Sequence, residues 1–548
     1  MNINNDMNNI IYRSGSTYLK INTLDIEGKI SDKKITEEQA EIVLYALTGN
    51  DFKVNAFAGT GKTTTIKCIA YALELFNLNQ KTIYLAFNKD IAKDVGQHKP
   101  YSMSVYTFHQ LARSSIIERD PRYVNKLKNP FVNYLTELPT SEKYGYFKTL
   151  DYLTFKTSLR VLNDFCRAPC QNITEDLVKD EYVQALIKDK VKKIIEKNSA
   201  NNSTLDTIFS GIEKNILYND LKQRLITFAR LLWQLILNPE NDIQLTFDVY
   251  LKYWSLTSAS LNCNTLLIDE SQDIDPVMIY GLNQIKSQKI YVGDKNQQIY
   301  RWRGAVNALD SIESYEMFIT ESFRLTKQTA HLANKILLKL GNQKSIVTNK
   351  DDFLLEVDKK YTLLCRTNLS ILKNVFDLAD SKKVCITSSN KGNYLNDIFK
   401  ICSLIVDFKN GLNSNHILFQ DFSSFKDLKE REDELSNELY QALKILDNYQ
   451  DNLGYIKQQI KKVESNVVES EDEADIVIST AHLSKGREWD FIKIDSDFEY
   501  YLKRYKDSST SYDLFCDELR LFYVTITRAK KSILNESYVN RVVMDVMN

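Results

Sequence analysis

The sequence predicts an α/β protein with two lobes, each built on a parallel β-sheet flanked by helices and each interrupted by a mainly helical insertion. Short apolar runs recur along the chain and alternate with amphipathic stretches, which is typical of parallel strands joined by crossover helices. The 548 residues exceed what one hydrophobic core normally holds, so roughly three or four structural units are expected. The runs that predict strands are residues 54–58, 82–86, 265–269 and 289–293 in a first group, and 361–366, 384–388, 475–480 and 491–494 in a second.

Two long helical stretches interrupt these strands and set the expected domain boundaries. The first contains helix-like segments at residues 182–197 and 221–237. The second contains residues 425–449, where Lys, Glu and Leu recur at helical spacing. We expect an N-terminal extension at 1–34, a first lobe of 35–110 and 249–310 with an insertion at 111–248, and a second lobe of 311–391 and 474–548 with an insertion at 392–473.

The second insertion allows two interpretations. Its leucines and Tyr440 are expected first to form the buried face of a helical hairpin, and the alternative is a stripe that binds a partner. The acidic run at residues 469–473 is expected to be a solvated linker, because a run of like charges rarely packs into a core.

The composition narrows the class of protein. An apolar content of 43% and a charged content of 26% are those of a soluble globular protein. A net charge of -1 argues against a protein coated in positive charge, so any nucleic-acid binding must come from local grooves. No stretch approaches the ~18 apolar residues that span a bilayer, and we expect a cytosolic protein, or a nuclear one in a eukaryotic host. Cys166 and Cys170 have no second ligand pair nearby and are expected to be reduced thiols.

Residues 58–63, with the sequence AGTGKT, predict a phosphate-binding loop. An apolar strand precedes the loop, and residues 63–75 are expected to form the following helix. Glycines allow backbone N–H groups to approach phosphates, and the helix N-terminus favours their negative charge. Lys62 would contact the β- and γ-phosphates, and the Thr63 hydroxyl would bind Mg²⁺. Ala56 stands where the pattern G-x-x-x-x-G-K-[ST] has its first glycine, so a chance glycine-rich turn is the alternative.

Two further segments carry candidate chemistry. Residues 266–270 form an apolar strand that ends in Asp269 and Glu270, at the strand end where open α/β sheets bind ligands. Asp269 would bind Mg²⁺ and Glu270 would polarise an attacking water, whereas an exposed acidic turn is the alternative. In residues 292–305, Tyr300 and Trp302 alternate with arginines, which suits stacking on unpaired bases; the alternative is that both aromatics are core residues.

Together these segments resemble, in order, the motifs of superfamily 1A DNA helicases of the UvrD/Rep/PcrA type. The likeness extends from about Ile35 to Ile533, and the run GDKNQQIYRWRG at 293–304 is its most diagnostic part. AFAGTGKT at 56–63, FNK at 87–89, YLKYW at 250–254 and RGAVNAL at 303–309 are most similar to the F-box DNA helicase branch. The resemblance implies two RecA-like P-loop lobes. An F-box itself is not expected, because the ~35 residues before the first lobe are fewer than such a module needs.

The resemblance assigns residues to ATP. Gln39 would contact the adenine edge, Gln297 would sense the γ-phosphate, and Arg324 and Arg528 would act as arginine fingers. Phe323 stands where a tyrosine normally packs on adenine, and Arg487 replaces a usual leucine. The expected catalytic residues are Lys62, Glu270, Gln297, Arg324 and Arg528; the expected ATP-binding residues are Gln39, Ala58, Gly59, Thr60, Gly61, Lys62, Thr63, Thr64, Phe323 and, on the ribose, Glu488; the expected metal ligands are Thr63 and Asp269.

The resemblance also assigns residues to a nucleic-acid strand. These positions combine stacking aromatics with groups that contact phosphates, and such contacts tolerate DNA or RNA. The preference for DNA therefore comes from the family alone. The expected DNA-binding residues are Phe87, Thr107, Phe108, His109, Tyr300, Trp302, Arg303, Arg366, Asn368 and His482.

The function that the resemblance implies is an ATP-dependent, Mg²⁺-requiring translocase or helicase that moves 3′-to-5′ on single-stranded DNA, with ATP bound in a cleft between the lobes. Single-stranded DNA or a tailed duplex is the expected substrate, and no membrane is involved. One alternative is a nucleoprotein remodeller that strips recombinase filaments. Another is an ATPase subunit of a complex with a nuclease or recombination protein in genome defence or repair. A P-loop protein unrelated to nucleic acid is a third alternative.

Overall fold

The computed structural model divides into two compact units, which we describe separately. Unit 1 comprises the described residues within Met1–Asn55, Lys62–Gly293 and Trp302–Met317, and unit 2 those within Ala56–Gly61, Asp294–Arg301 and Phe318–Asn548. The structure describes residues 11–13, 16–18, 35–76, 81–97, 99–128, 152–198, 211–241, 243–258, 261–299, 308–353, 360–387, 394–412, 416, 418–419, 422, 424–432, 435, 437–507 and 512–547.

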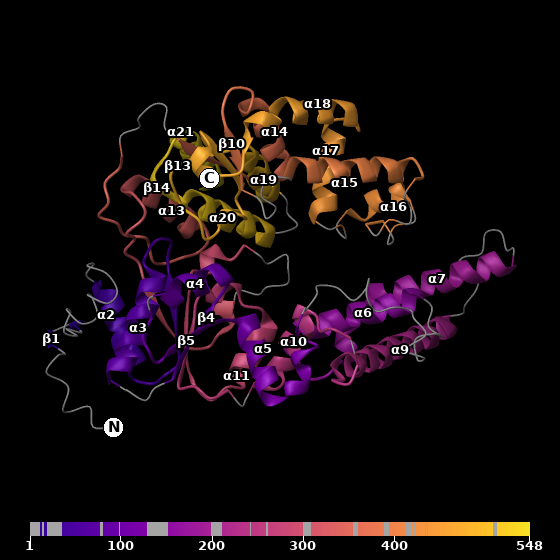
Figure 1. Ribbon diagram of the computed structural model, residues 1–548, viewed down its shortest axis with the longest axis horizontal. Helices are drawn as coiled ribbons and strands as arrows, with labels where there is room; N and C mark the ends of the chain where they lie inside the picture. The colour runs from indigo at the N-terminus through magenta and orange to yellow at the C-terminus, as the bar shows by residue number, and fades with distance from the viewer. Residues whose placement is uncertain are drawn as a thin grey trace. The chain divides into compact units, whose positions relative to one another are not determined.

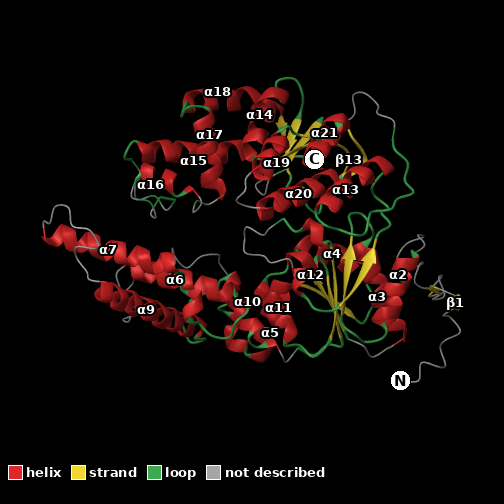
Figure 2. Ribbon diagram, turned by 180° about the vertical axis from the view of Figure 1, so that it is seen from behind, coloured by secondary structure: helices red, strands yellow, loops and turns green. Residues whose placement is uncertain are grey.

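Unit 1 is built around a six-stranded sheet with the order β5-β4-β6-β7-β3-β8. The pairs β5–β4, β4–β6, β6–β7 and β7–β3 are parallel. Helices α2 and α3 lie on one side of the sheet and α5, α10 and α11 on the other (Figures 1 and 2). The strands are β3 (Phe52–Ala56), β4 (Thr82–Ala86), β5 (Met103–Thr107), β6 (Thr265–Ile268), β7 (Gln288–Gly293) and β8 (Tyr315–Ile319); the flanking helices are α2 (Glu37–Ala46), α3 (Lys62–Phe76), α4 (Lys89–Gln97), α5 (Phe108–Arg119), α10 (Phe247–Ser255), α11 (Pro276–Asn283) and α12 (Ala308–Ser311).

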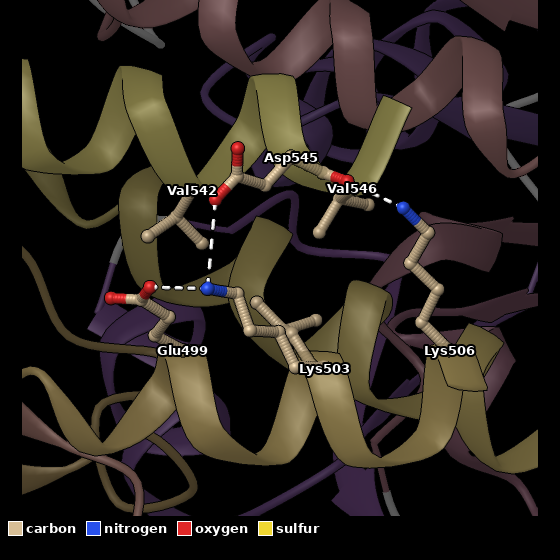
Figure 3. A pocket seen from close by; sticks show the side chains of 7 residues that line it. Glu499, Lys503, Lys506, Val542, Asp545 and Val546 are labelled. Atoms are coloured by element: carbon tan, nitrogen blue, oxygen red, sulfur yellow. Dashed lines mark hydrogen bonds and ion pairs between the residues drawn. The ribbon is translucent and has the colours of Figure 1, made fainter. Parts of the chain in front are cut away.

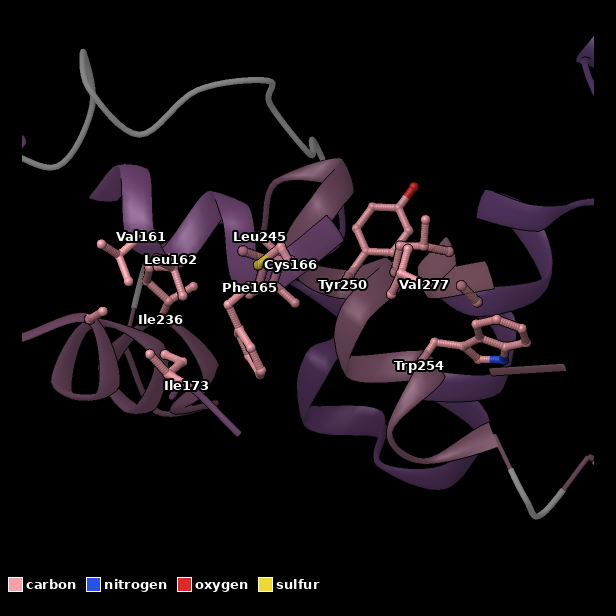
Figure 4. Close-up of a cluster of buried hydrophobic side chains, with 14 of the residues drawn as sticks. Val161, Leu162, Phe165, Cys166, Ile173, Ile236, Leu245, Tyr250, Trp254 and Val277 are labelled. Carbon is pink, nitrogen blue, oxygen red and sulfur yellow. The ribbon is translucent and has the colours of Figure 1, made fainter. Parts of the chain in front are cut away.

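The helical insertion of unit 1 is continuous with the core of the sheet. It contains α6 (Tyr152–Arg167), α7 (Asp180–Asn198) and α9 (Gly211–Leu237), and α6 packs along α9 (Figure 1). One buried cluster joins Phe165 and Cys166 of α6 to Tyr250 and Trp254 of α10, as Figure 4 shows. The same cluster reaches Leu85 in β4, so the insertion and the sheet share one hydrophobic core. A short antiparallel pair, β1 (Ile11–Arg13) and β2 (Ser16–Tyr18), precedes the sheet in the chain.

Unit 2 contains a second six-stranded sheet with the order β11-β10-β12-β9-β13-β14, in which every neighbouring pair is parallel. Successive side chains of a strand point to opposite faces, and accordingly Leu363 lies in one buried cluster and Leu364 in the other. The strands are β9 (Tyr361–Cys365), β10 (Val384–Ile386), β11 (Val467–Val468), β12 (Ile476–Thr480), β13 (Trp489–Ile494) and β14 (Ala529–Ile533); helices α13 (Lys327–Lys339), α20 (Tyr512–Ile526) and α21 (Glu536–Met547) contribute to the cluster that holds Leu364, as does α19 (Asp497–Asp507).

The second insertion forms a compact helical group on the other face. Leu439, Leu443 and Leu446 are buried, which confirms that the leucines form a buried face, and Tyr440 is half-buried. The group is larger than a hairpin: it consists of α15 (Tyr394–Lys409), α16 (Phe425–Glu430), α17 (Asn437–Asn448) and α18 (Leu453–Val463), which pack with α14 (Asn368–Leu378).

The acidic run is largely solvated as predicted, since Glu469, Asp472 and Glu473 are exposed, but Glu471 is held by protein partners. Residues Glu471–Glu473 form a 3-10 turn, and the Glu471 carboxylate accepts hydrogen bonds from Arg487 Nη1 at 2.9 Å and from Trp489 Nε1 at 3.1 Å. Opposite charge and an indole donor therefore hold this carboxylate against the start of β13.

The two parallel sheets confirm the predicted fold class. Strands β5, β8, β11 and β14 of the two sheets were not predicted: Ser104 and Glu316 interrupt the apolar residues of β5 and β8, β11 has only two residues, and β14 carries two lysines. No described helix is long and apolar enough to cross a membrane.

Candidate functional site

The phosphate-binding loop joins β3 to α3. Gly59 and Gly61 have φ values of +74° and +81°, a left-handed conformation that glycine adopts without strain. The Thr60 hydroxyl donates to the Phe57 carbonyl at 2.9 Å, which closes the turn. Helix α3 begins at Lys62, and Thr63 and Thr64 are half-buried in its first turn. The loop thus presents glycine backbone and a helix N-terminus, the arrangement that binds phosphate groups.

Gly59 is also packed closely by residues of its own unit, unit 2. A Cβ at this position would lie 2.4 Å from Arg324 Cβ and 2.8 Å from Ser322 Oγ. The Gly59 carbonyl accepts a hydrogen bond from Phe323 N at 2.9 Å, and the Ser322 hydroxyl donates to the Ala58 carbonyl at 2.8 Å. The segment that carries Arg324 is therefore fixed to the loop itself.

We expect Gly59→Ala to reduce ATP hydrolysis about 100-fold, because the added methyl must displace the loop or Arg324, and a displacement of ~1 Å near reacting groups has effects of that size. Gly49→Ala is the matched control, since Gly49 has a φ of +79° but no atom within 4 Å of an added Cβ. The control should lose only about 1 kcal/mol of stability from its left-handed backbone. Steady-state ATPase rates and melting temperatures of both variants test this expectation. Equal ATPase rates in Gly59→Ala and Gly49→Ala would contradict it.

Lys62 and two carboxylates form the charged centre of unit 1. Lys62 Nζ lies 3.2 Å from Glu270 Oε1, and the Gln272 amide donates to Glu270 Oε2 at 2.5 Å. Glu270 has a φ of 49°, a left-handed conformation that is costly for a residue with a side chain. The structure stores this strain at the residue that is predicted to polarise water.

Asp269 lies beside Glu270 and is buried. Glu270 N donates to Asp269 Oδ1 at 2.8 Å, and the Tyr84 hydroxyl donates to Asp269 Oδ2 at 2.5 Å. Burial, together with the Glu270 charge, raises the pKa of Asp269 to about 6. A divalent cation would relieve this crowding of negative charge, and a buried carboxylate together with the hydroxyl of Thr63, the residue after Lys62, is the kind of oxygen donor set that Mg²⁺ prefers. The residues therefore fit Mg²⁺.

The Gln39 side chain makes structural hydrogen bonds within unit 1. It is buried in α2, its side-chain oxygen accepts from Thr36 N at 2.9 Å, and its Nε2 donates to the Thr65 hydroxyl at 2.9 Å. These bonds cap α2 and tie it to α3, the helix that follows the phosphate-binding loop. The predicted contact with adenine stays a prediction.

A buried chain of hydrogen bonds in unit 2 links the loop to Gln297. The Tyr523 hydroxyl accepts from Ala58 N at 3.2 Å and donates to Asp294 Oδ2 at 3.1 Å. Gln297 Nε2 donates to the same carboxylate oxygen at 2.8 Å. Arg528 Nη2 then donates to Gln297 Oε1 at 3.4 Å. Three residues predicted for ATP, Ala58, Gln297 and Arg528, thus belong to one network.

Two arginines of unit 2 converge on the turn before β13. Arg324 Nη2 lies 2.6 Å from Glu488 Oε2, and Arg528 Nη1 donates to the Arg487 carbonyl at 3.2 Å. Arg528 is buried, whereas Phe323 beside Arg324 is 46% exposed. An exposed aromatic ring next to a polar cluster is available for stacking, and the stacking on adenine predicted for Phe323 stays a prediction.

The residues predicted for DNA in unit 1 differ in exposure. Phe87 follows β4 and is 41% exposed. The Thr107 hydroxyl caps α5 by accepting from Gln110 N, and Phe108 is buried in the core. The His109 ring packs edge-on against Phe247 and Tyr250, and burial lowers its pKa. Of these side chains, Phe87 is the one with its ring open to solvent.

In unit 2, Arg366 is engaged by protein partners. Its guanidinium makes two hydrogen bonds to Glu518, of 2.8 and 2.5 Å, and lies 4.9 Å from the Tyr501 ring. Asn368 begins α14, and it and His482 are half-buried. Tyr300, Trp302 and Arg303 lie outside the described residues, so their predicted stacking and strand contacts stay predictions.

Residues that the sequence analysis missed include Tyr84, Asp294 and Tyr523. Tyr84 had one sequence signal, a single phenol in a largely apolar strand. Asp294 lies in the run at 293–304 and Tyr523 lies five residues before Arg528, but neither had an assigned role. A surface pocket of about 280 Å³ between α19 and α21 is lined by the ion-paired Glu499, Lys503 and Asp545 (Figure 3), and none of the predicted site residues lines it.

The chain is similar to several known DNA helicases. The chain is 27% identical over 539 residues to F-box DNA helicase 1 of Gallus gallus, and 25% identical over 540 residues to F-box DNA helicase protein 1 of Schizosaccharomyces pombe, in each case across 92% of this chain. It is 26% identical over 320 residues, 54% of its length, to a probable DNA helicase II homolog of Mycoplasma genitalium. The chain spans about half the length of these relatives, at 49%, 58% and 42% respectively.

The family assignment follows from a match over half the chain. Residues 35–314 match the UvrD/REP helicase N-terminal domain. This stretch contains the phosphate-binding loop, the Asp269–Glu270 pair and the Gln297 segment described above. The chain therefore belongs to the UvrD/REP family of helicases.

Proposed function

We propose that this chain is an ATP-driven motor that moves 3′-to-5′ along single-stranded DNA and unwinds tailed duplex. The observation that carries the proposal is the buried chain from Ala58 N through Tyr523 and Asp294 to Gln297. Gln297 lies three residues before Tyr300 in the segment predicted to stack on bases. A change at the phosphate-binding loop would therefore be transmitted to that segment through hydrogen bonds.

The chemistry we propose uses the residues described above. Lys62 and the glycine backbone hold the phosphates of ATP. Thr63 and Asp269 would hold Mg²⁺, which when bound would supply neutralisation of negative charge on the phosphoryl oxygens. Glu270 accepts a proton from the attacking water. Arg324 and Arg528 stabilise the charge that develops during phosphoryl transfer, a role worth about 10³- to 10⁵-fold in related systems.

The proposal predicts that single-stranded DNA stimulates ATP hydrolysis by the purified protein. Steady-state rates are measured with single-stranded DNA, single-stranded RNA, duplex DNA and no polynucleotide, in the presence of Mg²⁺. Unwinding is then compared on duplexes with a 3′ or a 5′ single-stranded tail, and the 3′-tailed duplex should be the one unwound. Absence of stimulation by every polynucleotide would overturn the proposal, and unwinding of the 5′-tailed duplex alone would overturn its direction.

A second candidate is a translocase that removes proteins from DNA and unwinds poorly. The compact second insertion favours it, because the leucines of α17 are buried in a core that the insertion shares with the sheet of unit 2, and they therefore form no exposed surface for duplex. Displacement of a recombinase filament from single-stranded DNA, compared with unwinding of a 3′-tailed duplex under the same conditions, separates the two. Efficient displacement with weak unwinding would select the second candidate.

A further inference from the structure

Tyr84 places a phenol in the middle of a buried strand. All five residues of β4 are buried, and Tyr84 itself has no exposed surface. A hydroxyl taken from water into such a position is unfavourable unless it finds a hydrogen-bond partner. The partner here is a specific one: the Tyr84 hydroxyl donates to Asp269 Oδ2 at 2.5 Å.

The neighbouring strands bring the two side chains together. Strands β4 and β6 are parallel, with Tyr84 opposite Leu267 and Leu85 opposite Ile268. Asp269 N continues this pairing beyond β6 by donating to the Leu85 carbonyl at 3.0 Å. Both the backbone and the carboxylate of Asp269 are thus tied to β4.

The two hydrogen bonds of the Asp269 carboxylate determine its orientation. Oδ2 accepts from Tyr84, and Oδ1 accepts from Glu270 N at 2.8 Å. A carboxylate offers about four lone-pair positions, so two are left for a cation. A phenol is protonated at neutral pH, so the Tyr84 hydroxyl has a proton to donate to this carboxylate.

We infer that Tyr84 is a positioning residue that orients the Asp269 carboxylate for the metal ion of the metal–nucleotide complex. This inference rests on the proposed function, in which Asp269 binds Mg²⁺. Partners that orient a metal ligand typically change metal affinity 10- to 100-fold when they are removed. A purely structural hydrogen bond would change stability and leave metal affinity alone.

The test measures metal binding directly on the full chain. Mn²⁺ serves as the probe, because its electron paramagnetic resonance signal reports free and bound ion, and ADP is present at saturation. We expect Tyr84→Phe to raise the dissociation constant for Mn²⁺ about tenfold or more. Affinity for fluorescent ADP in EDTA should stay within about twofold of wild type, because the variant keeps the ring in the core and leaves the phosphate-binding loop intact.

Tyr291→Phe provides the matched control. Tyr291 is a buried tyrosine on β7 of the same sheet, and its hydroxyl is not bonded to Asp269. This control should bind Mn²⁺ as wild type does. A double-mutant cycle adds a second criterion: in an Asp269→Asn background, Tyr84→Phe should have no further effect on Mn²⁺ affinity.

The outcomes separate the inference from the proposed function. Wild-type Mn²⁺ affinity in Tyr84→Phe would overturn the inference alone. So would an equal loss of ADP affinity in EDTA, because that result indicates general damage to the site. Wild-type protein that binds no Mn²⁺ with ADP would overturn the metal site of the proposed function, and the inference with it.

Discussion

Glu270→Gln is expected to reduce DNA-stimulated ATP hydrolysis about 10²- to 10⁴-fold, the usual contribution of a general base. Glutamine has nearly the same shape and still accepts hydrogen bonds from Lys62 and Gln272, but it cannot take a proton from water. The left-handed backbone at Glu270 is kept, since only the side-chain terminus changes. The Glu270→Gln variant should therefore be a folded protein that hydrolyses ATP very slowly and still binds ATP and single-stranded DNA.

Three measurements check this expectation: the steady-state rate with single-stranded DNA, the affinity for a fluorescent ATP analogue, and the affinity for a labelled oligonucleotide. Glu118→Gln is the control, because Glu118 is an exposed glutamate on α5 of the same unit. The control should hydrolyse ATP at the wild-type rate. A Glu270→Gln rate within about tenfold of wild type would show that another group activates the water.

Arg324→Ala is expected to lower kcat about 10³-fold or more, with a smaller effect on ATP affinity. The Arg324 segment is fixed to the phosphate-binding loop through Gly59 and Ser322, and we expect its guanidinium to contact a phosphate bound at this loop. Arg324 is paired with Glu488 at 2.6 Å. Carboxylate and phosphate are equivalent partners for a guanidinium fork, and exchange between them is chemically reasonable.

Lys327→Ala is the control for Arg324→Ala. Lys327 lies three residues further along the chain and pairs with Asp351 at the surface, where ion pairs contribute little. Arg324→Lys adds a finer test, since lysine keeps the charge and loses the planar fork. We expect the kcat of Arg324→Lys to lie between that of the wild-type protein and that of Arg324→Ala. A wild-type kcat in Arg324→Ala would remove this residue from the catalytic set.

Local patterns were enough to predict the strands that carry the chemistry. Strand β4 was predicted with its observed bounds, and the phosphate-binding loop lies between a strand and a helix as expected. These segments are apolar runs next to glycine or acidic residues, so a short window contains the whole signal. Strand β14 has no such signal, because its sequence contains Lys530 and Lys531 in place of an apolar run. The side chains of both lysines form ion pairs with Asp490 at the surface.

The residues predicted to contact DNA show what local patterns leave open. Thr107, Phe108 and Arg366 sit in motifs that resemble strand-contacting ones, yet the structure uses their side chains for a helix cap, a core contact and an ion pair with Glu518. A sequence pattern identifies the segment and does not state which of its atoms are exposed. Exposure depends on residues far away in the chain.

Residue types and their spacing established the phosphate-binding loop, the acidic pair after β6 and the two-lobed α/β fold, because each depends on contacts within a few residues or on a repeated strand–helix pattern. Tertiary structure alone decided the partners: Tyr84 with Asp269, and Tyr523 with Asp294 and Ala58. These partners are separated by 185, 229 and 465 residues. Their meeting depends on which strands become neighbours and in what register, and no local pattern contains that information.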